Sequence, residues 1–222
     1  VFARFVRAYQ TVDPLTIGEL WALAITLRIV LIENMRRVTD QIVAEQNNRQ
    51  AADDLVDRVM GQGGAGSATV APDPTFRALA EATQALEGGP LPDAFAARIA
   101  QRLRGFDAVE TPLHGWLTEC LIAQGLTVDD VVLLAQSEQG ASNVTMRNIV
   151  TSMRLISEMD WPDVFEEVSA VDAQLRASSE FAAMDFASRN QYRTAIETLA
   201  RGSGMTEGAV TAAAMAFVAH GA

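Results

Sequence analysis

The fold of this 222-residue chain is decided by the stretch TIGELWALAITLRIVLIENMRRVTDQIV, which occupies residues 16–43. Thr16 and Glu19 have the spacing of a capping box, in which each side chain accepts a hydrogen bond from a free backbone N–H group at a helix start. The apolar positions that follow keep a helical spacing. They are Leu20, Leu23, Ala24, Leu27, Leu31, Met35, Val38, Ile42 and Val43. The pattern fades over residues 46–50 and returns at 55–59, which predicts one very long helix or two helices with a break near Asn47 and Asn48.

The remainder of the chain predicts shorter helices, because residues that cap helices recur between apolar runs. These candidate caps are Thr111, Thr127, Asp160, Asp185 and Thr206, and Ser142 or Asn143 is expected to start a further helix that ends near Met159. One helix is expected from Asp160 to Arg176. Segments that alternate apolar and polar residues are nearly absent. The sequence therefore predicts an all-α array of antiparallel helical hairpins, with one very long N-terminal helix and no sheet.

A glycine-rich stretch divides the chain. Residues 61–67 read GQGGAGS, and prolines follow at 72 and 74, a composition typical of a flexible linker. A phosphate-binding loop is disfavoured because the glycines follow a helix instead of opening one. We expect N-terminal helices over residues 1–60, a linker over 61–74 and a helical-hairpin domain over 75–222 that packs back on the long helix as one structural unit.

The charge of the chain limits the classes of function. It has 28 acidic and 17 basic residues, a net charge of −11, and every basic residue is arginine. The lack of lysine excludes Schiff-base and P-loop lysine chemistry, and the acidic balance argues against nucleic-acid binding. A single cysteine and two histidines exclude an internal disulfide and a multi-cysteine zinc site. The most apolar stretch, residues 20–32, contains Arg28 and is shorter than the roughly 20 residues of a bilayer span, so we expect no membrane-spanning segment.

Two arginine-bearing segments are the candidate binding sites. Arg147 and Arg154 share one face of a helix, and Arg189 and Arg193 share another. For Arg147 and Arg154, a polar face for a partner or a sugar is one interpretation, and interior arginines paired with acids such as Asp160 or Glu166 are the alternative. For Arg189 and Arg193, a binding site is one interpretation, and a local ion pair between Asp185 and Arg189 is the alternative. The candidate partner- or glucan-binding residues are Arg147, Asn148, Arg154, Trp161, Asp185, Arg189, Tyr192 and Arg193.

No catalytic residue and no metal ligand is proposed from the sequence. Adjacent carboxylates on a helix point in different directions, which argues against a two-carboxylate site. His114 and Cys120 are six residues apart on one expected helix, so their side chains lie about 120° apart around it and do not form a dyad.

Several short sequence segments provide a second source of information. They are RAYQ at 7–10, PLTIGELWA at 14–22, SMRLIS at 152–157, MDF at 184–186 and LARGS at 199–203. The chain resembles the N-terminal region of cyclic β-1,2-glucan synthases, because these short segments occur there in the same order. The resemblance is weak over residues 46–107. It implies a large bacterial inner-membrane enzyme that uses UDP-glucose and a divalent metal, with this region on the cytoplasmic face of the membrane.

The transferase motifs of that family are absent from the chain. No two aspartates are two residues apart, and no tryptophan follows an arginine, so neither Asp-x-Asp nor Gln-x-x-Arg-Trp is present. We therefore expect a non-catalytic accessory domain without a cofactor, which scaffolds the glycosyltransferase region and has other domains of the same polypeptide as partners. The alternative is a β-1,2-glucan-binding module that influences chain length or cyclisation.

Overall fold

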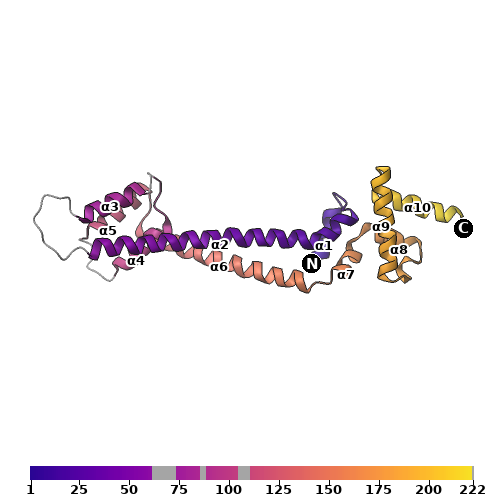
Figure 1. The fold of residues 1–222 in the computed structure, drawn as a ribbon, viewed down its shortest axis with the longest axis horizontal. Coiled ribbons are helices and arrows are strands. Elements are labelled where there is room, and N and C mark those ends of the chain that lie inside the picture. Colours follow the sequence, from indigo (N-terminus) through magenta and orange to yellow (C-terminus); the bar gives the residue numbers. More distant parts are fainter. Residues whose placement is uncertain (62–73, 86–88, 105–110, 222) are drawn as a thin grey trace, which may run out of the picture. The chain divides into compact units, whose positions relative to one another are not determined.

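The computed structural model describes residues 1–61, 74–85, 89–104 and 111–221, and over these ranges it contains helices and no strand (Figure 1). The all-α prediction is confirmed; the antiparallel-hairpin arrangement stays a prediction. The α-helices are α1 (Phe2–Gln10), α2 (Ile17–Gly61), α3 (Pro74–Ala85), α4 (Asp93–Leu103), α5 (Pro112–Ala123), α6 (Val128–Glu158), α7 (Trp161–Val168), α8 (Ala170–Ser178), α9 (Phe186–Ser203) and α10 (Glu207–Gly221), with a short 3₁₀ helix at Glu180–Ala183.

The long N-terminal helix is continuous. Helix α2 runs for 45 residues through Asn47 and Asn48, which fits the sequence because residues 19–60 contain neither glycine nor proline. The predicted capping box forms at its start: the Thr16 N–H donates to Glu19 Oε2 over 2.8 Å, and the Glu19 N–H donates to Thr16 Oγ1 over 3.2 Å. The hydrogen bond from the Thr16 backbone lowers the pKa of Glu19.

Two helix boundaries differ from the prediction. Ser142 and Asn143 do not start a helix, because α6 is a single 31-residue helix that begins after Thr127 and contains both residues in its interior. The helix expected from Asp160 to Arg176 is instead two helices, α7 and α8. Ser169 leaves helical geometry with φ −67° and ψ 117°, and its hydroxyl accepts from the Asp172 N–H, so it caps α8.

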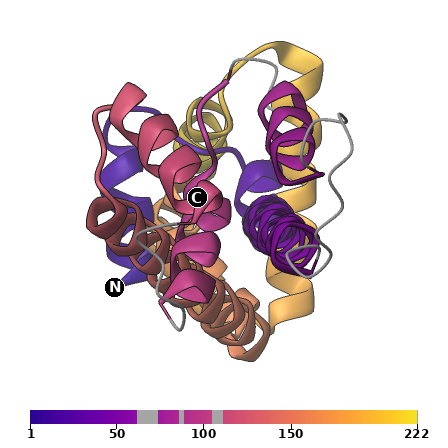
Figure 2. The same ribbon diagram turned by 90° about the vertical axis from the view of Figure 1, so that its left-hand side faces the viewer.

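The described residues divide into two compact units, and residues 33–150 form unit 2. Helices α3, α4 and α5 are grouped beside the C-terminal part of α2 (Figures 1 and 2). The core of unit 2 consists of small and branched apolar side chains, among them Leu55, Ile99, Leu113, Leu117 and Val131. The Trp116 indole N–H donates to Thr83 Oγ1 over 2.8 Å and joins α5 to α3.

Unit 1 consists of residues 1–32 and 151–222. Its core is richer in aromatic side chains. Trp21 stacks on Phe165 with ring centroids 4.5 Å apart and an interplanar angle of 12°. Phe2 meets Trp161 edge-on at 5.8 Å. Because Trp21 belongs to α2 and Phe165 to α7, these contacts hold the start of the chain to its C-terminal helices.

The predicted linker over residues 61–74 lies almost wholly outside the described residues, and the predicted domain boundaries stay a prediction. In the part of the chain that the structure describes, no helix has both the length and the apolar character needed to cross a bilayer.

Candidate functional site

The densest group of charges in unit 1 is a set of side chains from α7, α8 and α9. We call it the arginine–carboxylate cluster, and its members are Glu166, Asp172, Arg176, Arg189 and Arg193. It contains two carboxylates and three guanidinium groups. Two of the three arginines, Arg189 and Arg193, are among the sequence-predicted site residues.

Asp172 and Arg193 form the centre of this cluster. Both side chains are almost completely buried, with relative exposures of 0% and 1%. The Arg193 Nε donates to Asp172 Oδ1 over 3.0 Å, and its Nη2 donates to Asp172 Oδ2, so the pair is bidentate. Asp172 Oδ1 also accepts from the Ser169 hydroxyl over 3.3 Å. The same carboxylate therefore belongs to the first turn of α8 and to the ion pair with α9.

Aromatic rings enclose the Arg193 guanidinium. Its Cζ lies 4.9 Å from the ring centroid of Phe165, 5.1 Å from that of Phe186 and 5.8 Å from that of Phe181. Burial acts to lower the pKa of Arg193, but the hydrogen bonds to Asp172 and Glu166 outweigh it and the pKa is raised. The buried Nη1 has no hydrogen-bond acceptor among the described residues.

Glu166 connects the remaining arginines. Its Oε1 accepts from Arg193 Nη2 over 2.9 Å, and its Oε2 lies 3.0 Å from Arg189 Nη1 and 3.4 Å from Arg176 Nη2. The sequence offers Glu166 as a partner for Arg147 and Arg154 if these are interior. In the structure Glu166 pairs with Arg176, Arg189 and Arg193.

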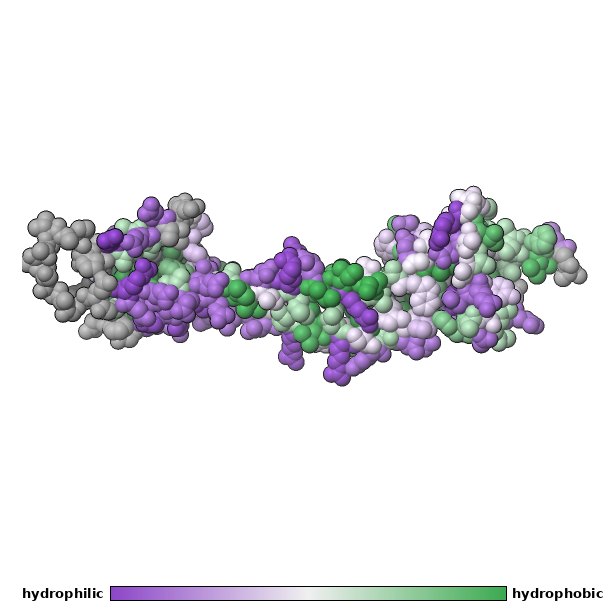
Figure 3. Space-filling view, viewed as in Figure 1, coloured by the Kyte–Doolittle hydropathy of each residue, from purple (hydrophilic) through white to green (hydrophobic). Residues whose placement is uncertain are grey.

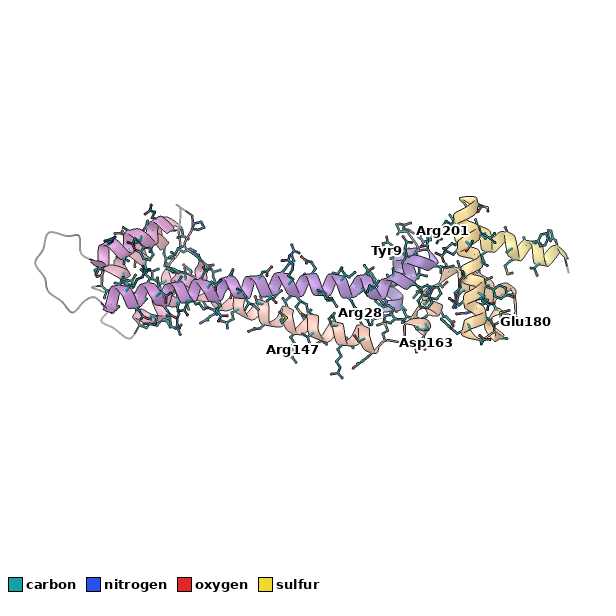
Figure 4. All side chains as sticks on the ribbon, in the orientation of Figure 1. Tyr9, Arg28, Arg147, Asp163, Glu180 and Arg201 are labelled. Atoms are coloured by element: carbon teal, nitrogen blue, oxygen red, sulfur yellow. The ribbon has the colours of Figure 1, made fainter. Side chains whose placement is uncertain are left out.

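The other predicted site residues have separate surroundings. Arg154 is exposed and pairs with Glu158 over 2.7 Å along α6. Arg147 and Asn148 belong to unit 2, where both are exposed, and Figure 4 shows the Arg147 side chain projecting outward from α6. Their role as binding residues stays a prediction.

The aromatic and acidic candidates in unit 1 have structural contacts. Trp161 is half-buried, and its indole N–H donates to the Ile156 carbonyl over 2.9 Å. Tyr192 is 49% exposed and meets Phe181 edge-on. Asp185 caps α9 as predicted, accepting from the Ser188 N–H over 2.9 Å, and this hydrogen bond lowers the pKa of its carboxyl. Their role as glucan-binding residues stays a prediction.

Sequence reasoning missed Asp172 and Arg176 as members of the cluster. A local signal for Asp172 existed, because Ser169 and Asp172 have capping-box spacing. Arg176 lies one turn further along α8, at the spacing that lets it reach Asp172, and the two groups are 3.3 Å apart. What the sequence could not supply was the partner across helices, Arg193.

The cluster is suited to holding helices together. Its carboxylates are paired with guanidinium groups, so neither is positioned as a free acid or base. Elsewhere in the described residues, Cys120 is half-buried, and burial followed by the charge of Glu119 raises the pKa of its thiol, which disfavours the nucleophilic thiolate. No group of three or more metal-ligating side chains occurs among those residues.

Comparison with known proteins gives one strong similarity. The chain is 36% identical over 214 residues to the cyclic β-(1,2)-glucan synthase NdvB of Rhizobium meliloti. The match covers 96% of this chain but only 7% of the length of that protein. No family model and no solved structure matches. The resemblance to cyclic β-1,2-glucan synthases is therefore confirmed, and nearly the whole of this chain is related to one short segment of such an enzyme.

Proposed function

We propose that this chain is a non-catalytic helical segment of a cyclic β-1,2-glucan synthase, and that it scaffolds the glycosyltransferase region on the cytoplasmic face of the bacterial inner membrane. The synthase would transfer glucose from UDP-glucose by means of a divalent metal held in other parts of the same polypeptide. Support comes from the similarity to a short segment of a long synthase and from the missing Asp-x-Asp and Gln-x-x-Arg-Trp motifs.

One surface feature carries the scaffold role. Trp21, Ile25, Ile29 and Ile32 lie within one face of α2 in unit 1, and we call them the α2 stripe. Their relative exposures are 37%, 55%, 59% and 55%. Apolar side chains are visible at the surface along α2 in Figure 3. Contiguous exposed apolar side chains mark interaction surfaces. Other domains of the same polypeptide are the partner that this proposal assigns to the stripe.

The first experiment deletes the segment corresponding to residues 1–222 from the full synthase in membranes matched for expression. Incorporation of glucose from UDP-glucose is measured together with the size and the cyclic fraction of the product. Loss of all incorporation by a correctly inserted protein supports the scaffold. Unchanged incorporation with altered ring size or cyclisation would favour the alternative, a glucan-binding module. Unchanged synthesis and product would contradict both roles.

Point substitutions sharpen this test. Ile25→Glu together with Ile29→Glu places charges on the α2 stripe, and both positions are exposed, so the isolated chain should retain its helical circular dichroism. In the full synthase the scaffold role predicts a loss of glucose incorporation. Thr26→Glu, exposed on another face of the same helix, is the matched control and should have no effect. Equal losses from both variants would contradict a role for the stripe.

A further inference from the structure

A hollow of about 340 Å³ lies in unit 2, where α2, α4 and the first half of α6 supply its walls. Its apolar lining consists of Ala94, Ala97, Val132 and Ala135. Its polar lining consists of Arg49, Arg98, Gln101, Arg104, Gln136 and Gln139. No acidic residue lines it among the described residues, although the whole chain has a net charge of −11. The hollow is therefore a local basic site on an acidic protein.

Hydrogen bonds fix the orientation of two of the glutamine amides. Arg98 Nη1 donates to Gln101 Oε1 over 3.1 Å, and Arg49 Nη2 lies 3.4 Å from Gln139 Oε1. A guanidinium group only donates, so the amide oxygen of each glutamine is turned toward its arginine. The amide NH₂ groups of Gln101 and Gln139 are then left as donors. Both the arginines and these glutamines thus offer N–H groups to an occupant.

The three arginines differ in how far their charge is balanced. Arg98 forms a bidentate pair with Asp53, with distances of 2.9 and 3.0 Å, and Arg49 pairs with Glu45 over 3.3 Å. Arg104, which follows the last residue of α4, is exposed and has no acidic partner among the described residues. Arg98 and Arg49 are thereby held in place by acids that do not line the hollow, while Arg104 brings a charge that no acid of the described residues balances.

We propose that this hollow binds the phosphate group of a small molecule. Phosphate oxygens accept hydrogen bonds and carry negative charge, which matches a lining of guanidinium and amide donors. A neutral sugar is a poorer match, because its hydroxyl groups need acceptors as well as donors. The volume is at the lower end of the range of small-molecule sites, about 300–1,000 Å³, so it admits more than a single inorganic phosphate. The site is separate from the α2 stripe and does not depend on the scaffold role.

The test is a calorimetric titration of the full 222-residue chain, in chloride buffer, with inorganic phosphate and with pyrophosphate. Saturable binding is expected, tighter for pyrophosphate. Arg104→Ala should weaken it about tenfold, the typical loss for a hydrogen bond to a charged group. Gln139→Glu, which adds a carboxylate to the lining, should abolish it. Arg37→Ala removes the same charge from an exposed position of α2 that does not line the hollow, and should leave binding unchanged.

Two further probes identify the source of the phosphate and test the selectivity of the hollow. Vesicles of phosphatidylglycerol, compared with phosphatidylcholine, report whether a lipid headgroup is the source. Binding to these vesicles alone, weakened by Arg104→Ala and not by Arg37→Ala, supports the phosphate site with a headgroup as its ligand. Acetate binding as tight as phosphate binding would overturn the proposal. So would the absence of saturable binding to every phosphate probe, or equal weakening by Arg37→Ala and Arg104→Ala.

Discussion

Asp172 of α8 and Arg193 of α9 form a bidentate ion pair that is shielded from solvent on all sides, with relative exposures of 0% and 1%. Taking two charges out of water is costly, and their mutual attraction repays that cost only when the geometry is good and the remaining groups are hydrogen-bonded. Asp172 meets this condition through Ser169, and Arg193 meets most of it through Glu166 and three aromatic rings. The pair therefore fixes how α8 and α9 pack.

Removing one partner of this pair should be far more damaging than removing an exposed charge. Asp172→Ala leaves a buried guanidinium without its main counter-ion, and we expect a loss of about 3–5 kcal/mol in the free energy of unfolding. Urea denaturation measures it. The control is Glu167→Ala, which removes the 2.7 Å pair with Arg7, where both side chains are 52% exposed; its cost should be below about 1 kcal/mol. Similar losses for the two variants would contradict this account.

Replacing both partners of the pair shows whether the loss of stability comes from the unpaired charge or from lost packing. The double variant Asp172→Leu with Arg193→Met fills much of the same volume without burying a charge. We expect it to be more stable than Asp172→Ala, because no ion is left unpaired. Urea denaturation of the two variants measures the difference. A double variant that is no more stable than Asp172→Ala would show that the buried charge is not what makes the single substitution costly.

The two glycines at the end of α9 should respond in opposite directions to alanine. Gly204 has φ +69°, a left-handed conformation that costs a residue with Cβ about 1 kcal/mol or more, so Gly204→Ala should lower the melting temperature. Gly202 lies within α9, and a Cβ there meets no atom within 4 Å, so Gly202→Ala should stabilise by about 0.5–1 kcal/mol. Scanning calorimetry of both variants checks the sign of each change.

In unit 2, Leu117 is fully buried at the centre of the core. Leu117→Ala should cost about 2–5 kcal/mol of unfolding free energy, because the substitution loses apolar contact and leaves a cavity. Leu133→Ala is the matched control, since Leu133 is 64% exposed and its loss should change stability by less than about 0.5 kcal/mol. Chemical denaturation followed by circular dichroism measures both. A cost for Leu117→Ala near that of the control would argue against the described core.

The raised pKa of Glu207 predicts that the stability of the fold depends on pH. Burial, opposed by the hydrogen bond from the Ile17 N–H and reinforced by Glu197 and Glu19, raises the pKa of Glu207 above the ordinary glutamate value of 4.5. Folding therefore favours the protonated carboxyl, so its stabilising contribution is complete below pH 4.5 and is lost as the pH rises through the folded pKa.

Glu207→Gln removes this titration and retains an amide oxygen that accepts from Ile17. Relative to the unsubstituted chain, the variant should gain stability at pH 7 compared with pH 4, because the unsubstituted chain loses its contribution over that interval. Urea unfolding of both proteins at the two pH values gives the difference. Glu119→Gln, at an exposed position, serves as the control. A difference between variant and unsubstituted chain that does not change with pH would contradict the shift.

Features that depend on neighbouring residues were predictable from the sequence. The caps at Thr16, Thr111, Thr127, Asp160 and Asp185 all form, because a side-chain oxygen and the N–H groups two or three residues later are brought together by the helix start itself. The all-α class followed from the same local signals. Local chemistry alone was sufficient for each of these features.

Features that depend on packing were not predictable from the sequence. Ser142 is a good cap by type, yet it is buried in the interior of α6, where the helix continues on both sides. Conversely, the helix is interrupted at Ser169 without a glycine or proline. The Ser169 hydroxyl accepts a hydrogen bond from the Asp172 N–H and so caps a new helix. The pairing of Asp172 with Arg193 joins residues 21 positions apart, and no periodicity within either helix specifies it.

Unit 1 is made of two stretches that lie far apart in the sequence, so the ribosome synthesises them at different times. Residues 1–32 leave the ribosome before their partners in unit 1, which begin at residue 151. At about 5–20 residues per second, the intervening stretch of roughly 120 residues takes on the order of ten seconds to synthesise. Through that interval Val6, Ile17 and Leu20 have none of their C-terminal core partners, while unit 2 can already be complete. The nascent N-terminal helices are thus a natural substrate for chaperones during translation.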